Sequence, residues 1–276
     1  MPNERLRIAT WNLWWRFGPW ESRQPAIIET MKRVDADVWC LQEVYAIRDG
    51  DNQADVLAAE LGEYHVAHAS RFDLTEFDTS FGNAVLSRWP ITSSEMRPLP
   101  APDGLDELRC VMRADVDAPR YALEVFVTHL NWRMDQSHVR QQQVRSICEF
   151  VAETRDRREF PPVVCADFNA VPDAEEIRML TGRTSVPVPK LVFIDAWGAA
   201  GAGPGTTWDN RNGFAAEEFE PDARIDYVFI GYPRDVGVGH VEAACLVGDE
   251  PVDGVWPSDH FGVCADVRLE PVVSSI

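Results

Sequence analysis

The sequence predicts an α/β fold built around mixed β-sheets, and two observations support this prediction. Short apolar runs rich in Val, Ile and Phe alternate along the chain with segments that have the periodicity of amphipathic helices. Two successive runs, 110–116 and 121–128, are separated by a short turn and are expected to form an antiparallel hairpin. This combination is typical of α/β proteins whose sheets contain both parallel and antiparallel strands.

The predicted strands are short apolar runs bounded by polar or turn-forming residues. Strands that are covered on both faces carry near-continuous apolar sequences, as in Val163-Val164-Cys165-Ala166. In chain order, the predicted strands span residues 6–11, 38–41, 83–86, 110–116, 121–128, 163–166, 225–230 and 262–269.

Three segments between these strands have apolar residues at helical spacing. The first, over residues 25–34, is predicted to carry Pro25 in its first turn, where the missing N–H is not needed. The second spans about 138–155, and the third spans 173–180, where an Asp and a Glu at capping-box spacing open the segment. The glycine-rich stretch at 198–205 predicts a long surface loop.

Composition limits the classes of partner. The chain has 276 residues, which allows one large domain or two small ones, and no Ser/Gly linker, low-complexity tract or fixed-period repeat divides it. Its formal net charge of −19 disfavours loose, sequence-independent binding to nucleic acid, because such binding depends on Lys and Arg neutralising phosphates. A locally positive cleft remains compatible with this charge.

The sequence also indicates a compartment. Residues 1–13 are charged without the apolar stretch of a signal peptide, and no apolar run approaches the roughly 20 residues that span a bilayer. The six cysteines lack C-x-x-C spacing and lie mostly in apolar runs, which favours free thiols over a disulfide framework. We therefore expect a cytoplasmic protein without stable membrane insertion.

Polar side chains lie in or directly after many of the predicted strands. The run that begins at Val163 stops at Asp167, Phe168 and Asn169. Because successive side chains of a strand alternate between its faces, Asp167 and Asn169 are expected to point the same way. Strand ends are where α/β sheets build their sites. The other polar residues in such positions are Asn12, Gln42, Glu43, His129, Asn131 and Asp226, and Asp259 and His260 lie just before the last predicted strand.

Each of these residues alone has a simpler interpretation. An isolated Asn or Glu after a strand is more often a turn residue or a solvated end, and Asp226 or His129 alone is as readily a hydrogen-bonded core residue. Together they are the groups that hydrolysis of a phosphate ester on a hard divalent cation requires. Glu43 and Asp259 suit the cation, and His260 with Asp226 suits an oriented base.

Seven short motifs, in order, cover nearly the whole chain. They are TWNL (10–13), LQEV (41–44), GNAVLSRWPI (82–91), THL (128–130), ADFN (166–169), RIDYVFI (224–230) and SDH (258–260). Together they resemble the endonuclease/exonuclease/phosphatase superfamily, which includes DNase I. The resemblance implies a DNase I-like four-layer α/β/β/α sandwich, with two mixed sheets packed face to face. It also implies that residues 1–276 form one domain, with a single active site where the strand ends of both sheets meet.

The resemblance implies a cofactor and roles around it. The cofactor would be Mg²⁺ (or Mn²⁺), with Glu43 as its main ligand and Asn12 and Asp259 close to the cation or its waters. His260 would be the base or would orient the attacking water, and Asp226 would hold it.

Further roles on the substrate side follow from the same resemblance. Asp167 would position or deprotonate the attacking water, and Asn169 and His129 would hold the phosphoryl oxygens as negative charge builds on them. Asn83 corresponds to a family position near the phosphate. Trp208 lies in a segment, TTWDN, that resembles a substrate-side loop of some branches, including the tyrosyl-DNA phosphodiesterases.

One residue departs from the family pattern. The family usually reads Gly-Asp-Phe-Asn where this chain has Ala166. Because Ala disfavours positive φ, a backbone that needed such an angle here would displace Asp167.

These features predict a divalent-metal-dependent hydrolase of phosphoester bonds, with a phosphodiesterase preferred. Without a basic-aromatic array, a small-molecule phosphoester, a lipid head group or a nucleic-acid end is favoured over a long duplex as the substrate. A nuclease acting on DNA or RNA ends is the alternative. A catalytically silent binding module on the same fold is more remote, because it would have lost part of the catalytic set, which is complete here. We expect a monomer.

Overall fold

The computed structural model describes residues 5–48, 50–62, 64–74, 79–101, 108–154, 160–234 and 236–272. They form two six-stranded sheets. In spatial order, the first sheet contains β11 (Val241–Val247), β12 (Gly262–Arg268), β1 (Arg5–Asn12), β2 (Val38–Ile47), β4 (Thr79–Ser87) and β3 (His65–Leu74). The second sheet contains β5 (Ile91–Pro98), β6 (Cys110–Asp117), β7 (Ala122–His129), β8 (Val163–Asp167), β10 (Asp226–Gly231) and β9 (Phe193–Asp195). The helices are α1 (Trp20–Val34), α2 (Gln53–Leu61), α3 (Ser137–Thr154), α4 (Glu175–Leu180), α5 (Ala196–Ala200) and α6 (Gly213–Ala216).

Both sheets are mixed, as predicted. In the first sheet β1 is parallel to β2 and antiparallel to β12. In the second sheet β7 is parallel to β8 and antiparallel to β6, which confirms the predicted hairpin. The parallel pairs β1–β2 and β7–β8 are each joined by a crossover helix, α1 and α3, because parallel neighbours cannot be linked by a tight turn.

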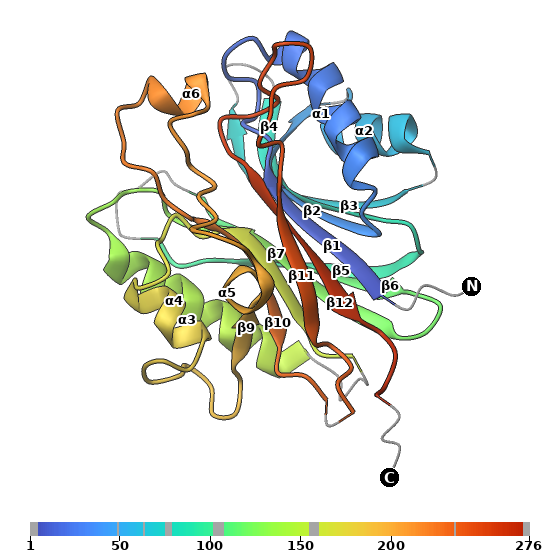
Figure 1. The fold of residues 1–276 in the computed structure, drawn as a ribbon, viewed down its shortest axis with the longest axis vertical. Coiled ribbons are helices and arrows are strands. Elements are labelled where there is room, and N and C mark those ends of the chain that lie inside the picture. Colours follow the sequence, from blue (N-terminus) through green and yellow to red (C-terminus); the bar gives the residue numbers. More distant parts are fainter. Residues whose placement is uncertain are drawn as a thin grey trace.

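Three apolar clusters separate four layers. One cluster lies between the two sheets and includes Val85 of the first and Val125 of the second. A second packs α1 and α2 against the outer face of the first sheet, around Trp39. A third packs α3 and α4 against the outer face of the second sheet, around Phe126. Figure 1 shows these two helical layers on opposite sides of the strands, so the predicted α/β/β/α sandwich is confirmed.

The eight predicted strands all occur, and the four strands that the sequence did not predict are the four edge strands, β3, β5, β9 and β11. An edge strand has one neighbour and is less completely covered, so it lacks the continuous apolar run of a central strand. β5 (ITSSEMRP) shows this plainly, since most of its side chains are exposed.

Two helix starts were predicted wrongly. α1 begins at Trp20, so Pro25 lies inside the helix rather than in its first turn. The reason is that the Pro19 carbonyl already accepts hydrogen bonds from the following backbone and begins the first turn there. α4 begins at Glu175 after Ala174, with no side-chain cap, so the predicted capping box does not form. The sequence also did not predict α2, α5 and α6.

The predicted loop and the predicted end of the second helix differ from the structure or lie partly outside the described residues. The predicted loop at 198–205 overlaps the end of α5, and only residues 201–205 lack regular structure. The predicted second helix is α3, described to Thr154, and its expected end at Arg155 lies outside the described residues. Among the residues that the structure describes, no helix has both the length and the apolar character needed to cross a membrane.

Candidate active site

The strand registers bring the predicted polar residues to one end of the sandwich. In the second sheet Asp167, at the end of β8, is paired with His129 of β7 on one side and with Asp226 of β10 on the other. The contribution of the first sheet consists of Asn12 at the end of β1, Glu43 in β2, and Asp259 and His260 just before β12. Contacts of Asp167 with residues of both groups show that the two sheets build one site.

Asp167 lies at the centre of this site and is buried. Its Oδ2 is 3.1 Å from Asn12 Nδ2, 3.3 Å from His129 Nε2 and 3.7 Å from His260 Nε2. Its Oδ1 accepts a hydrogen bond from the backbone N–H of Asn169 at 2.9 Å. One carboxylate therefore contacts residues from both sheets and from the loop before β12.

His260 is held from two sides. Its Nδ1 is 3.0 Å from Asp226 Oδ2, and the Trp208 ring packs edge-on against the imidazole at 5.0 Å between ring centres. The Asp226 backbone N–H donates to Thr207 Oγ1, which fixes this end of β10. Burial by itself would lower the pKa of His260, but the carboxylates of Asp226 and Asp167 raise it well above its ordinary value. Burial, followed by the Asp226 charge, raises the pKa of Asp167 to about 7.

Glu43 lies in a bulge of β2 with a positive φ of 52°. Its Oε1 accepts a hydrogen bond from Asn12 Nδ2 at 3.2 Å, and its buried Oε2 has no hydrogen-bond partner among the described residues. Burial raises the pKa of Asp259 to about 7, and the nearby Glu43 charge adds to this rise. Mutual repulsion between buried carboxylates and a carboxylate oxygen without a partner are what a hard divalent cation would relieve, so these residues fit Mg²⁺ or Mn²⁺.

A second group of side chains could also hold a cation. Ligand atoms of Asp167, Asp226 and His260 lie within 4.8 Å of one another. In this group, however, Asp226 Oδ2 is already hydrogen-bonded to the His260 ring.

The amide of Asn12 is oriented by the backbone. Its Oδ1 accepts a hydrogen bond from the Trp14 N–H at 2.9 Å, so its Nδ2 faces Glu43 and Asp167. Asn12 therefore holds two carboxylates of the site in place from the end of β1.

Asn169 reaches the site by a different route from the one predicted. It lies beyond the end of β8 with a φ of 49°, so strand alternation does not set its direction. Instead, Asp167 Oδ1 accepts from its backbone N–H, and its Nδ2 donates to the Leu130 carbonyl, next to His129. Strand alternation is therefore the wrong explanation for the position of Asn169, although the residue does lie beside Asp167 and His129.

The departure at Ala166 does not distort the backbone. Ala166 is buried in β8, in regular register with Thr128 and Tyr227, and has no positive φ. Because a strand backbone accepts Ala as readily as Gly, the extra methyl group leaves Asp167 in its register.

The two residues predicted on the substrate side are both buried. Trp208 packs against His260, as described above. Asn83, in β4, donates from Nδ2 to the Cys110 carbonyl at 3.2 Å. It is thus placed one residue away from Arg109, which contacts the site directly.

Arg109 was not predicted. Its Nη1 lies 2.8 Å from His129 Nδ1, and because a guanidinium can only donate, Nδ1 must be the accepting nitrogen. The neutral ring therefore carries its proton on Nε2, which faces Asp167 Oδ2. Burial, followed by the Arg109 charge, lowers the pKa of His129 well below its ordinary value. No sequence signal marked Arg109, because it lies outside the seven motifs.

Arg23 was also missed. This arginine of α1 is 1% exposed. Its guanidinium donates to backbone carbonyls on both sides of the site: Leu13, Trp14, Trp15, Phe17 and Pro257. The segment after Asn12 and the segment before Asp259 are thereby tied to one side chain. From sequence alone, a basic residue in a helix is expected to be exposed to solvent. Only the packed structure shows that Arg23 ties these two segments together.

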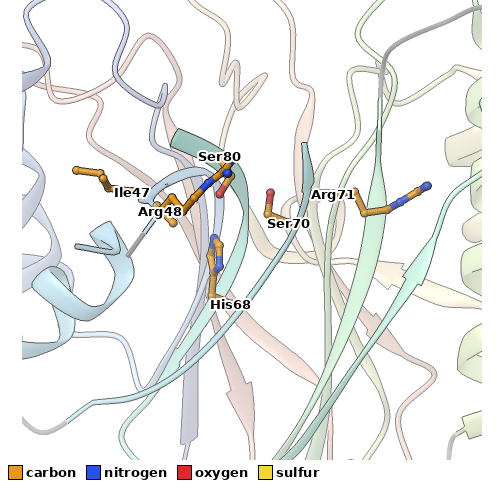
Figure 2. A pocket seen from close by; sticks show the side chains of 7 residues that line it. Ile47, Arg48, His68, Ser70, Arg71 and Ser80 are labelled. Atoms are coloured by element: carbon orange, nitrogen blue, oxygen red, sulfur yellow. The ribbon is translucent and has the colours of Figure 1, made fainter. Parts of the chain in front are cut away.

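A cavity of about 410 Å³ lies where β2, β3 and β4 end. Its lining residues are Ala46, Ile47, Arg48, His68, Ser70, Arg71 and Ser80. None of these described residues is acidic, although Asp and Glu outnumber Lys and Arg in the chain by 45 to 26. In Figure 2 Arg48 reaches toward Ser80, and Arg71 extends away from Arg48.

Arg71 of the cavity and Arg109 of the site both influence Cys110. Burial raises the pKa of Cys110 to about 11, and the positive charges of Arg71 and Arg109 oppose that rise. Both guanidinium groups therefore lie near Cys110, and Arg109 in turn contacts His129. One arginine that lines the cavity and one that contacts His129 therefore both act on the Cys110 thiol.

Buried carboxylates, carboxamides and histidines at one end of a two-sheet sandwich are typical of enzymes that cleave phosphoester bonds. The model of the endonuclease/exonuclease/phosphatase family matches residues 9–260. The chain belongs to this family, and the predicted resemblance is confirmed.

Solved structures of other proteins share the fold of this chain. An endonuclease/exonuclease/phosphatase from Beutenbergia cavernae is 24% identical, with a TM-score of 0.75 over 97% of this chain and 72% of that one. D. rerio TDP2 complexed with a single-strand DNA product is 20% identical, with a TM-score of 0.76 over 96% of this chain and 100% of that one. The human Nocturnin catalytic domain with a bound sulfate anion is 20% identical, with a TM-score of 0.73 over 96% and 95%. No curated protein sequence matches this chain significantly.

Proposed function

We propose that this protein is a divalent-metal-dependent phosphodiesterase. The observation that carries the proposal is the convergence on Asp167 of Asn12, His129 and His260, drawn from both sheets and the loop before β12. Such an arrangement supplies a base, hydrogen-bond donors for a developing phosphoryl charge, and oxygen ligands for a cation at one place.

Glu43 and Asp259 would hold the cation, with Asn12 keeping Glu43 in position. A buried carboxylate oxygen without a hydrogen-bond partner occurs on both sides, as Glu43 Oε2 and as Asp226 Oδ1. We prefer the Glu43 side to the Asp167, Asp226 and His260 group because His260 already lies against both carboxylates of that group, whereas the charges of Glu43 and Asp259 repel each other. When bound, Mg²⁺ or Mn²⁺ would neutralise charge on the phosphate and lower the pKa of a coordinated water.

The remaining residues would act on the water and the phosphate. Asp167 would accept the proton of the attacking water, and His260, whose raised pKa favours the protonated ring, would orient that water. Asp226 would keep the His260 ring in place through Nδ1. His129, with its proton on Nε2, and the Asn169 amide would donate to phosphoryl oxygens as negative charge develops.

Metal removal tests this proposal. The measurement is hydrolysis of a panel containing single- and double-stranded DNA, RNA, sphingomyelin, inositol phosphates, nucleotides and an aryl phosphodiester. With EDTA we expect the rate on any cleaved substrate to fall by about 10²-fold or more, and Mg²⁺ or Mn²⁺ to restore it. Activity that survives EDTA would contradict a metal-dependent mechanism, and an uncleaved panel would favour the silent binding module.

A nuclease acting on DNA or RNA ends is the second candidate. The acid-free cavity with Arg48 and Arg71 supports it, because a phosphate next to the scissile one needs a cationic subsite. The fold similarity to D. rerio TDP2 with a single-strand DNA product is consistent with this candidate.

We also propose that the protein is a cytoplasmic monomer. Its free cysteines support a reducing compartment.

The Arg48→Gln substitution tests the nuclease candidate. For a short oligonucleotide, we expect KM to rise by about tenfold, since a charge-assisted contact with phosphate is lost. For an aryl phosphodiester, which has no second phosphate, the change in KM should be several times smaller. Arg145→Gln, on the exposed side of α3, is the matched control that removes an equal charge elsewhere. Equal effects of Arg48→Gln on both substrates would count against a phosphate subsite in this cavity.

A further inference from the structure

Two cysteines lie directly opposite each other on neighbouring strands, away from the catalytic residues. Cys245 of the edge strand β11 is in register with Cys264 of β12. Residues paired in this way have Cα atoms about 4.5–5.5 Å apart and side chains on the same face. That spacing falls within the range of Cα separations found in disulfides, about 4.4–6.8 Å. Both thiols are free in this structure.

The surroundings of the pair make the two thiols unequal. Cys245 is exposed, whereas Cys264 is 2% exposed and packs in the cluster beneath α1. The Cys264 thiol donates a hydrogen bond to Cys245 and lowers the pKa of Cys245 to about 7, although burial opposes this effect. The Arg7 guanidinium also favours the Cys245 thiolate, and Asp266 and Asp249 disfavour it. Conversely, the pKa of Cys264 is raised by Cys245 and by burial.

We infer that Cys245 and Cys264 form a redox site that takes hydroperoxides as the oxidant, with Cys245 as the reacting thiol and Cys264 as the resolving thiol. Exposure lets a peroxide reach Cys245, and the register places the second sulfur next to it. This site is independent of the proposed phosphoesterase function.

The chemistry proceeds in two steps. In the first, the Cys245 thiolate attacks the peroxide, so that an S–O bond forms, the O–O bond breaks, and the leaving oxygen takes up a proton as alcohol or water. In the second, Cys264 sulfur attacks the sulfenic sulfur, the S–S bond forms, the S–O bond breaks, and hydroxide leaves as water with the Cys264 proton. Two electrons pass from the thiol pair to the peroxide.

The disulfide would close a segment that includes catalytic candidates. Asp259 and His260 lie between Cys245 and Cys264 in the sequence. A bridge across the β11–β12 pair would therefore tie the edge strand to the strand that follows His260. It would also restrict the unfolded chain more than the folded one, which raises stability.

The test uses the whole chain exposed to hydrogen peroxide, alkylated with N-ethylmaleimide, and examined by intact mass and peptide mapping. We expect the oxidised chain to lose two hydrogens and to carry no N-ethylmaleimide on Cys245 or Cys264. We also expect a linked peptide pair containing both residues, and reversal of these changes by dithiothreitol. We also expect Tm to rise by about 5 °C on oxidation. Cys264→Ser should stop at a sulfenic acid on Cys245 that dimedone traps, and Cys148→Ser, in α3, should form the disulfide as the wild type does.

Two results would overturn the inference. One is a peptide map in which peroxide drives Cys245 to sulfinic acid without linking it to Cys264. The other is a Cys264→Ser protein, folded by circular dichroism, that still loses two hydrogens. A fall in Tm on oxidation would show that the bridge does not fit the native strands.

Discussion

Asp167→Asn is expected to lower kcat by about 10³-fold or more on whichever phosphoester the protein cleaves. The substitution preserves shape but removes the negative charge at the centre of the site. It also places an amide against the donors Asn12 Nδ2 and His129 Nε2, which both point at Asp167 Oδ2. The water would lose its proton acceptor, and the donors would lose their common partner.

The measurement is steady-state kinetics together with thermal unfolding. Asp115→Asn, a buried Asp of β6 that is bonded to Arg113 and Ser93, is the matched control and should leave kcat within about twofold, because it lies outside the site. A folded Asp167→Asn protein with wild-type kcat would rule out the proposed role of this carboxylate.

Gly262→Ala is expected to destabilise the fold strongly. A Cβ at Gly262 would lie 2.3 Å from the Thr10 carbonyl oxygen and 3.0 Å from Trp11 side-chain carbons. Since the first of these atoms belongs to the backbone of the neighbouring strand β1, the contact can be relieved only by separating β1 from β12. We expect the free energy of unfolding to fall by about 3 kcal/mol or more, and Tm by about 6–12 °C.

Differential scanning calorimetry measures this effect. The matched control is Gly213→Ala, because a Cβ there meets no atom within 4 Å and the backbone has no positive φ. Gly213→Ala should leave Tm nearly unchanged. If the two variants unfold at the same temperature, close contact between β1 and β12 does not explain the glycine at 262.

Prediction of the fold succeeded where burial is two-sided. The central strands carry continuous apolar runs, as β8 does from Val163 to Ala166, because both of their faces are covered. Edge strands such as β5 have polar and exposed residues that resemble loops in sequence. α1 was placed too late because a proline usually marks a helix start, whereas here Pro25 is inside the helix.

The sequence motifs contain most of the candidate residues that the structure brings together, and they miss two arginines that contact the same region. Asp167, His129 and Asp226 come together because the ends of β7 and β8 are in register with the start of β10. Arg109 and Arg23 lie outside the seven motifs, and Arg23 lies on a helix rather than at a strand end. Their importance depends on contacts with His129 and with backbone carbonyls, which have no signature in sequence.

The sequence by itself determined the family, the α/β class and the set of catalytic candidates, because alternating apolar runs and seven ordered motifs are local features. Only the tertiary structure decided how these residues are oriented. Asn12 turns its amide toward two carboxylates because the Trp14 N–H holds its oxygen, and His129 carries its proton on Nε2 because Arg109 donates to Nδ1. Such orientations depend on hydrogen bonds between groups far apart in the chain, and those bonds exist only once the two sheets have packed.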